Sequence, residues 1–229
     1  MLNNKLIIFG TGEIAELAYY YFKHDSDYKI VAFTADDEYV NSNTFKGLPL
    51  IPFSEITGKY SPKEYNAHVA LSYNKLNQIR AEKYYAVKEK GYKLVSYVCS
   101  KSFYWPDLSI GDNCFILENQ TIQPTVKIGN NVMIWSGNHL GHGCQIKDHV
   151  YISSHVCISG HTIIDEYCFV GVNATFKEFI KVGKRVFITM DASVVKNIKD
   201  DAVVIGARCK ILKSGDPIAI MLKQNYFNL

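Results

Sequence analysis

The strongest constraint on this chain is an apolar side chain at every sixth position of its second half. In hexads counted from Ser109, fifteen consecutive second places are apolar, and only Phe176 among them is not aliphatic. These residues are Ile110, Ile116, Ile122, Ile128, Ile134, Leu140, Ile146, Ile152, Ile158, Ile164, Val170, Phe176, Val182, Ile188 and Val194. A helix requires an apolar period of about 3.6 and a half-buried strand a period of about 2. A period of six therefore indicates neither.

Period six predicts short strands joined at corners, with three hexads in each triangular coil and the second-place side chain pointing inward. Successive coils would stack by parallel strand pairing, about 4.8 Å apart. Glycines recur at the third place, where we expect turns with positive φ or close approach of two backbones. They are Gly111, Gly129, Gly141, Gly171 and Gly183. We therefore expect a left-handed parallel β-helix of hexapeptide repeats over residues 101–229, with a short C-terminal tail.

Residues 1–100 have a different pattern. Apolar runs predict strands over residues 5–9, 28–34, 67–72 and 92–97, and polar-apolar patterns predict helices over residues 13–24 and 75–90. This alternation predicts a small Rossmann-like parallel sheet. The fold class expected is an α/β N-terminal domain, residues 1–100, followed by the β-helix domain.

The turn Gly10-Thr11-Gly12 separates the first predicted strand from the first helix. Backbone N–H groups at such a helix N-terminus can hold a phosphate. Asp36 and Asp37 follow the second strand, where a carboxylate can contact a ribose or a base. Because about 100 residues hold one mononucleotide-sized half, a nucleotide monophosphate or nucleotide-sugar is favoured over NAD. Alternatively, the turn only packs helix against strand.

The composition argues against several partners. Lys and Arg number 25 against 22 Asp and Glu, so charge indicates neither nucleic acid nor an acidic membrane surface. The N-terminal apolar run spans residues 6–9, too short for a signal peptide or a membrane span. The 6 cysteines form no C-x-x-C pair. We expect a cytoplasmic protein with reduced thiols.

Five of the 7 histidines lie between residues 139 and 161. Successive hexads lie on different sides of a prism, so His149, His155 and His161 should point in three directions and cannot share one ion. We therefore expect no metal site. His155 and His161 are interpreted as corner or interface residues.

The whole arrangement resembles the bacterial nucleotide-sugar acyltransferases, which include the N-acetyltransferases of bacillosamine and perosamine synthesis and sialic acid O-acetyltransferase relatives. The resemblance covers the glycine turn, the segment SYNKLNQIRAEKY at residues 72–84, and the coils through the tail at 204–208. The stretch NHLGHGCQIKDHV at residues 138–150 is similar to the one that holds the family's catalytic histidine, which implies that role for His142. Some relatives have an acidic residue where this chain has Gly143. The family's G-x-P-A-K reads GARCK at residues 206–210.

The resemblance implies an acetyl-CoA-dependent N-acetyltransferase of glycan or O-antigen biosynthesis, acting on the amino group of a nucleotide-linked amino-deoxy sugar. His142 would be the general base, and the amine would attack the thioester directly. Gly160, eighteen residues later and hence one coil above His142, would offer its N–H to the thioester carbonyl. The substrate-binding residues expected are Gly10, Thr11, Gly12, Asp36, Asp37, Ser72, Asn74, Trp135 and His139. The acetyl-CoA-binding residues expected are Tyr151, Gly160, Gly206, Ala207, Arg208 and Lys210. Such enzymes are usually homotrimers with sites between subunits.

Alternatives stay open at this point. The same fold could transfer an acyl group to a hydroxyl of a sugar or a sialic acid. A non-catalytic nucleotide-sugar binding or sensing protein would keep the glycine turn and leave His142 idle, and a carbonic-anhydrase-like scaffold would need zinc. The sequence does not identify the sugar, the nucleotide, the acyl group or the residue that orients His142.

Overall fold

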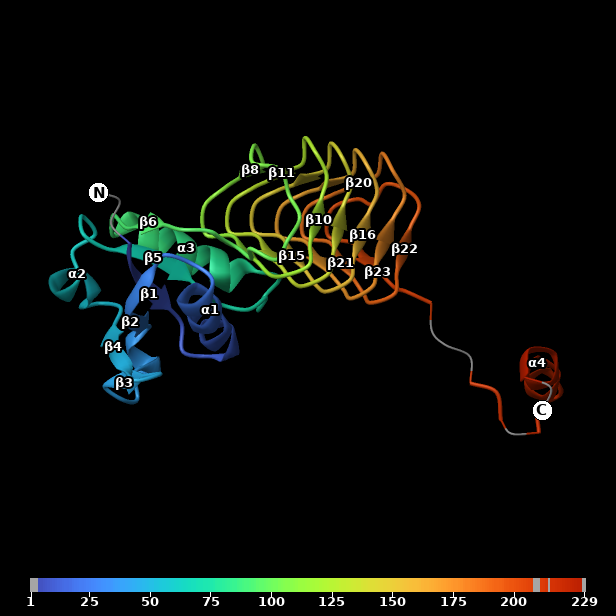
Figure 1. Cartoon of the computed structure of the whole chain (residues 1–229), viewed down its shortest axis with the longest axis horizontal. Helices are drawn as coiled ribbons and strands as arrows, with labels where there is room; N and C mark the ends of the chain where they lie inside the picture. The colour runs from blue at the N-terminus through green and yellow to red at the C-terminus, as the bar shows by residue number, and fades with distance from the viewer. Residues whose placement is uncertain (1–3, 208–210, 214, 228–229) are drawn as a thin grey trace.

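The computed structural model describes residues 4–207, 211–213 and 215–227. A small sheet flanked by helices adjoins one end of a long triangular prism, and the last helix lies beyond the prism's other end (Figure 1). The helices are α1 (Glu13–His24), the 3-10 turn η1 (Asp37–Tyr39), α2 (Ile56–Lys59), α3 (Gln78–Glu89) and α4 (Pro217–Phe227).

The N-terminal sheet has the strand order β3-β4-β2-β1-β5-β6. Its strands are β1 (Lys5–Phe9), β2 (Lys29–Ala35), β3 (Thr44–Phe45), β4 (Leu48–Pro52), β5 (Asn66–Val69) and β6 (Lys93–Leu94). Neighbours are parallel except β3 and β4. Along β1, Leu6 and Ile8 pack into one core and Ile7 and Phe9 into another. Burial on both faces explains the continuous apolar run of β1.

The expected α/β order is confirmed, but several boundaries differ and some elements were not predicted. The strand expected over residues 67–72 ends at Val69, and the strand expected over residues 92–97 is two short strands in different sheets, at Lys93–Leu94 and Tyr97–Val98. The helix expected from residue 75 begins at Gln78, because Lys75, Leu76 and Asn77 have φ of 50°, 49° and 66°. A left-handed run of three residues cannot continue a right-handed helix. The sequence also gave no signal for β3, β4 or α2.

The prism is built from strands of two residues each. One side contains β7 (Tyr97–Val98), β9 (Phe115–Ile116), β12 (Met133–Ile134), β15 (Tyr151–Ile152), β18 (Phe169–Val170), β21 (Phe187–Ile188) and β23 (Val203–Val204). The second side contains β10 (Thr121–Ile122), β13 (His139–Leu140), β16 (Cys157–Ile158), β19 (Thr175–Phe176) and β22 (Ser193–Val194). The third contains β8 (Ser109–Ile110), β11 (Lys127–Ile128), β14 (Gln145–Ile146), β17 (Ile163–Ile164) and β20 (Lys181–Val182).

The predicted period places the core correctly. Ile134 pairs with Ile152, one coil of eighteen residues later, and both are 0% exposed. Sixth-place residues such as Cys144 and Val150 fill the same interior. Each buried aliphatic side chain contributes up to about 1.5–3 kcal/mol, an upper estimate because the unfolded chain already buries some surface.

Positive φ occurs at the fifth place of the hexads, and the expectation for the third-place glycines was wrong on this point. The fifth-place residues with positive φ are Asn113, Asn119, Thr125, Asn131, Gly137, Gly143, His149, His155, His161, Tyr167, Asn173, Phe179, Arg185 and Asp191. The third-place glycines instead serve the close approach of coils, as the alternative expectation stated. A Cβ on Gly141 would lie 2.6 Å from the backbone N of Gly160.

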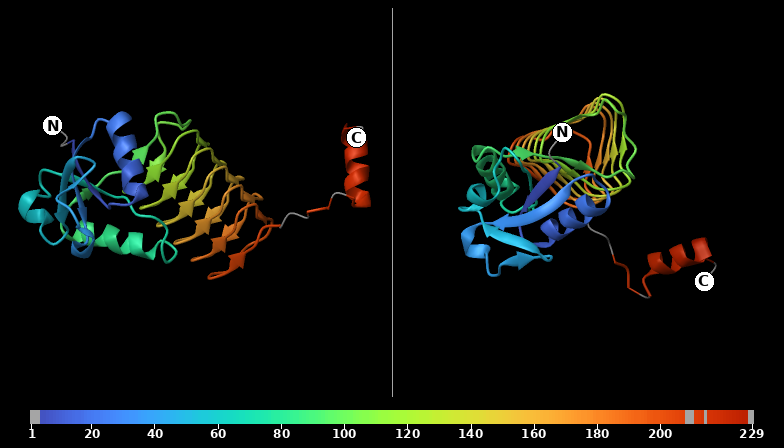
Figure 2. Two further views of the ribbon diagram at one scale, coloured as in Figure 1. Left: turned by 90° about the horizontal axis from the view of Figure 1, so that it is seen from below. Right: turned by 60° about the vertical axis from the view of Figure 1, so that its left-hand side comes forward.

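The N-terminal sheet packs against the first coils on the first side of the prism, and the right-hand view in Figure 2 shows the sheet beside the triangular coils. Outward first-place side chains of that side, among them Phe115, Met133 and Tyr151, share a core with Leu6 and Ile8. Every third hexad begins with such a large apolar residue, a sequence signal that could have identified the covered side. The corner between the second and third sides therefore lies opposite the N-terminal sheet.

Helix α3 packs along the corner between the third and first sides. The Arg80 guanidinium donates through Nη2 to the carbonyls of Asn131 at 3.1 Å and Val150 at 3.4 Å. Tyr85 Oη lies 3.0 Å from Nε2 of the buried His149. These contacts fix the N-terminal sheet against the prism.

Candidate active site

His142 stands at the fourth place of its hexad, directly after β13, on the corner opposite the N-terminal sheet. Its side chain is exposed. Its neighbours come from three successive coils. Gln123 lies in the coil below, and Gly160 and His161 lie in the coil above.

The expected position of Gly160 relative to His142 is seen in the structure. A Cβ on Gly160 would lie 2.7 Å from Cε1 and 2.9 Å from Nε2 of His142. The ring therefore occupies space that only a glycine leaves open. Among the hydrogen bonds of the residues that the structure describes, none uses the Gly160 N–H. Gly160 itself is buried, so its N–H is an unused donor inside the contact between two coils.

His139, expected to contact substrate, points outward from β13 and is half-buried. Its strand pairs with those of Thr121 and Cys157, so it lies on the second side of the prism beside the His142 corner. Its contact with substrate stays a prediction.

Trp135 and Tyr151 do not lie with His142. Tyr151 is 4% exposed and packs between the first side of the prism and the N-terminal sheet. Trp135 is half-buried and donates its Nε1–H to Tyr151 Oη. The expectation that Tyr151 contacts acetyl-CoA is therefore unsupported, because packing against the N-terminal sheet leaves it almost no exposed surface. Trp135 stays a candidate for substrate only.

The expected nucleotide-binding residues follow β1, β2 and β5, at the carboxyl edge of the parallel sheet, where ligands of such sheets bind. Gly10 has φ of 131°, and a Cβ there would lie 2.6 Å from the carbonyl oxygen of Ala70. Gly12 caps α1 with no side chain over the backbone, and a Cβ on it would meet nothing within 4 Å. Thr11 lies between the two. The backbone at the helix N-terminus is thus open to a ligand.

The two aspartates after β2 already have partners. The carboxylate of Asp36 forms an ion pair with Nζ of Lys83 at 2.6 Å. The carboxylate of Asp37 accepts two hydrogen bonds from Ser54, one from the hydroxyl at 2.6 Å and one from the backbone N–H at 3.2 Å. The Ser54 hydrogen bonds hold the pKa of Asp37 below its usual range. Contact of Asp36 or Asp37 with a ribose or a base therefore stays a prediction.

Ser72 and Asn74 flank Tyr73 in the loop after β5, and the sequence did not single out that tyrosine. Its ring packs against Tyr151 at 5.0 Å and Phe169 at 4.9 Å. The loop therefore connects the carboxyl edge of the sheet with the first side of the prism. The sequence signal that could have identified this loop is an aromatic residue between two polar ones.

The tail residues expected to bind coenzyme A are only partly described. Gly206 donates its N–H to Thr189 Oγ1 at 2.8 Å, and Ala207 is exposed. Arg208 and Lys210 lie outside the described residues.

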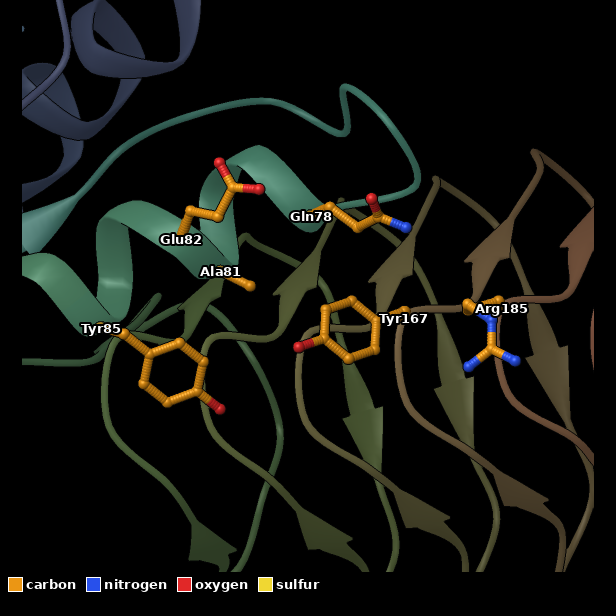
Figure 3. A pocket seen from close by; sticks show the side chains of 6 residues that line it. All are labelled: Gln78, Ala81, Glu82, Tyr85, Tyr167 and Arg185. Atoms are coloured by element: carbon orange, nitrogen blue, oxygen red, sulfur yellow. The ribbon is translucent and has the colours of Figure 1, made fainter.

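A cavity of about 300 Å³ opens between α3 and the corner between the third and first sides (Figure 3). It is lined by Gln78, Ala81, Glu82, Tyr85, Tyr167 and Arg185. The Arg185 guanidinium is paired with Asp201 at 2.6 Å. The cavity follows a different edge of the prism from His142, and no predicted site residue lines it.

Buried thiols in the prism are poor nucleophiles. Burial raises the pKa of Cys144 to about 11 and those of Cys114 and Cys168 to about 12. A thiol must ionise to attack a thioester. These groups therefore favour direct attack by the acceptor.

Over residues 4–207, 211–213 and 215–227, no group of three His, Cys, Asp or Glu residues could hold a metal ion, and no helix has the length and apolarity to cross a membrane.

Comparisons with known proteins concern the repeat and the fold. The bacterial transferase hexapeptide (six repeats) family matches residues 125–160. The chain is 30% identical over 88 residues to the acyl-[acyl-carrier-protein]–UDP-N-acetylglucosamine O-acyltransferase of Sinorhizobium fredii, or 35% of this chain and 33% of that protein. It spans a third or less of the length of the curated relatives it matches.

Two solved structures superpose on most of the chain. One is the acetyltransferase domain of PglB from Neisseria gonorrhoeae in complex with acetyl coenzyme A, with a TM-score of 0.79 and 23% identity over 92% of this chain and 100% of that one. The other is PerB from Caulobacter crescentus in complex with CoA and GDP-perosamine, with a TM-score of 0.79 and 18% identity over 91% and 97%. The expected fold is confirmed.

Proposed function

We propose that this chain, a hexapeptide-repeat protein with the fold of PglB and PerB, is an acetyl-CoA-dependent N-acetyltransferase acting on the amino group of a nucleotide-linked amino-deoxy sugar. One observation carries the proposal: the exposed imidazole of His142 lies directly over the backbone of Gly160, whose N–H forms no hydrogen bond within the described part of the chain. A general base thus stands beside a free N–H donor, in a fold whose relatives were solved with acetyl-CoA, CoA and GDP-perosamine.

The chemistry follows from these two groups. His142 removes a proton from the sugar amine as its nitrogen attacks the thioester carbon. General-base catalysis by an imidazole contributes about 10²–10⁴-fold in rate. The Gly160 N–H donates to the carbonyl oxygen as negative charge develops on it. The tetrahedral species then expels the thiolate of coenzyme A and leaves an amide.

The glycine turn supplies the second half of the site. Backbone N–H groups of Thr11 and Gly12 at the start of α1 hold the nucleotide phosphates, Gly10 forms the turn while its own N–H donates to the carbonyl of Thr34 at 2.8 Å, and Asp36 contacts the ribose or base. Ser72 and Asn74 approach the sugar from the next loop. Trp135 and His139 contact the sugar from the prism, and Gly206, Ala207, Arg208 and Lys210 contact coenzyme A.

The complete site requires a second copy of the chain. The nucleotide edge adjoins the first side of the prism, whereas His142 stands on the opposite corner. One chain therefore does not bring its own nucleotide edge to its own His142. A homotrimer, with each site formed between two subunits, would do so.

We further propose that the enzyme works in the cytoplasm, in glycan biosynthesis.

The matched curated relative is an O-acyltransferase, which supports sugar O-acetylation as a second candidate. Offering nucleotide-sugars that differ only in an amino or a hydroxyl group, and measuring release of coenzyme A, separates the two. Transfer to the hydroxyl sugar alone would contradict N-acetylation.

The test of the base is His142→Ala and His142→Asn, with His155→Asn as the control at a corner away from it. Turnover should fall at least 100-fold in both His142 variants, with an unchanged thermal unfolding midpoint. The control should keep its turnover. Undiminished turnover in His142→Ala would refute the assignment of the base.

A further inference from the structure

The side-chain amide of Gln123 lies within hydrogen-bond distance of the His142 ring. Gln123 follows β10 at the third place of its hexad, in the coil below. Its Oε1 accepts the backbone N–H of His142 at 2.8 Å and lies 3.2 Å from Nδ1 of the ring. One oxygen therefore faces both the backbone and the side chain of the same histidine.

This double contact fixes which ring nitrogen carries the proton. A backbone N–H can only donate, so the amide atom that faces it must be the oxygen and not the NH₂ group. The same oxygen faces Nδ1, and two lone pairs would repel each other there. Nδ1 must therefore be protonated, and in the neutral ring Nε2 then has the free lone pair.

The next coil confines the other side of the ring. The His161 ring meets that of His142 edge to face at 4.9 Å, and the His161 N–H donates to the His142 carbonyl at 2.8 Å. His161 stacks in turn on Phe179 at 5.0 Å. A Cβ on Gly143 would lie 2.6 Å from Nδ1 of His161. The absence of a side chain at Gly143 therefore leaves the space that the His161 ring occupies. Over the described parts of the chain, no carboxylate forms an ion pair with His142.

We infer that Gln123 is a positioning residue for His142, which it holds in the Nδ1–H tautomer with Nε2 free to accept a proton. The consequence for turnover rests on the proposed function. The tautomer itself does not, since it is a property of the protein without substrate. A neutral amide thus supplies the orienting contact from the coil below.

The experiment compares Gln123→Leu, Gln123→Glu and Gln145→Leu in the full chain. Leu keeps the approximate size of Gln123 and removes the acceptor, whereas Glu keeps an oxygen acceptor. Gln145 lies on the same coil as His142, and its side-chain oxygen accepts a hydrogen bond from Lys147 Nζ at 2.8 Å. Gln145→Leu therefore controls for the same loss of polarity nearby.

Nitrogen NMR of ¹⁵N-histidine-labelled protein at neutral pH, with His142→Asn used to assign the signals, reads the tautomer directly. The wild type, Gln123→Glu and Gln145→Leu should show protonated Nδ1 and bare Nε2. Gln123→Leu should show a mixture of both tautomers. Its kcat should fall at least tenfold with KM for both substrates within twofold, and Gln123→Glu should keep more of kcat than Gln123→Leu.

Retention of a pure Nδ1–H tautomer in Gln123→Leu would overturn the inference, and so would an unchanged kcat in a variant whose tautomer had shifted. If the wild type acetylated no amino sugar, the proposed function would fail. The NMR comparison would still decide the orienting role.

Discussion

The imidazole of His142 lies against the α-carbon of Gly160 in the next coil, so closely that a Cβ on Gly160 would stand 2.7 Å from Cε1. Real Cβ atoms essentially never approach another atom so closely. The pair is therefore a contact that tolerates no side chain at residue 160.

Gly160→Ala should displace the His142 ring and lower kcat at least tenfold. The clash is with the end of an exposed side chain, so the unfolding free energy should change by less than about 1 kcal/mol. Gly141→Ala is the matched comparison, since its Cβ would lie 2.6 Å from the backbone N of Gly160. Gly141→Ala should lower the unfolding free energy by about 1–3 kcal/mol, because the added Cβ overpacks the contact between the two coils. Denaturant unfolding and steady-state kinetics measure both. Equal activity in Gly160→Ala and wild type would show that the ring can move without loss.

Gly12→Ala should raise KM for the nucleotide-sugar about tenfold and leave KM for acetyl-CoA unchanged. Its Cβ meets no protein atom within 4 Å, so the fold tolerates it, but it would occupy the space through which phosphates approach the backbone. Gly10→Ala should instead destabilise the protein, because of its φ of 131° and the contact with Ala70. Calorimetric titration of the nucleotide into Gly12→Ala checks the first effect. Unaltered nucleotide affinity would favour the interpretation of the turn as packing alone.

Asn131→Ala should destabilise the protein by about 2–4 kcal/mol, the sum of left-handed backbone strain and unsatisfied buried partners. Asn131 has φ of 53°, accepts from Asn113 at 2.8 Å and lies 2.9 Å from Nδ1 of His149. Asn119→Ala is the control, since Asn119 has φ of 59° but is exposed. Asn119→Ala should lower the unfolding free energy by the backbone strain alone, about 1–2 kcal/mol. Similar losses in both variants would contradict a role for the buried ladder.

Acid should destabilise the protein between about pH 6.5 and pH 4. Burial lowers the pKa values of His68 and His149 to about 4 in the folded protein, whereas an unfolded histidine has a pKa near 6.5. In that window the unfolded chain binds protons that the folded chain does not, so stability falls as pH falls and the loss levels off below pH 4. The loss should be on the order of 1–3 kcal/mol for His149.

His149→Asn isolates that contribution. Asparagine suits the left-handed corner, as Asn113 and Asn131 do in the two coils below. The unfolding free energy of this variant, measured in denaturant at several pH values, should depend less steeply on pH than that of wild type. An identical slope would mean that His149 titrates normally in the folded state.

The spacing of the hexads predicted the core and the coil register because each inward side chain recurs at a fixed length of chain. Gly160 over His142 follows from the same spacing, since eighteen residues make one coil. Tyr151 was misjudged because the repeat does not state which of three equivalent sides another part of the chain covers. Lys75, Leu76 and Asn77 were misjudged because their left-handed turn leaves no periodic signal.

The sequence alone thus determined the prism, its interior and the place of His142 on a corner, since these depend on a local repeat and on burial of apolar side chains. Only the tertiary structure decided which side the N-terminal sheet covers, that His149 is buried beneath α3, and that Gln123 orients His142. Those facts depend on how surfaces distant in the chain pack together and on the directions of side chains. A repeat in the sequence contains no information about either.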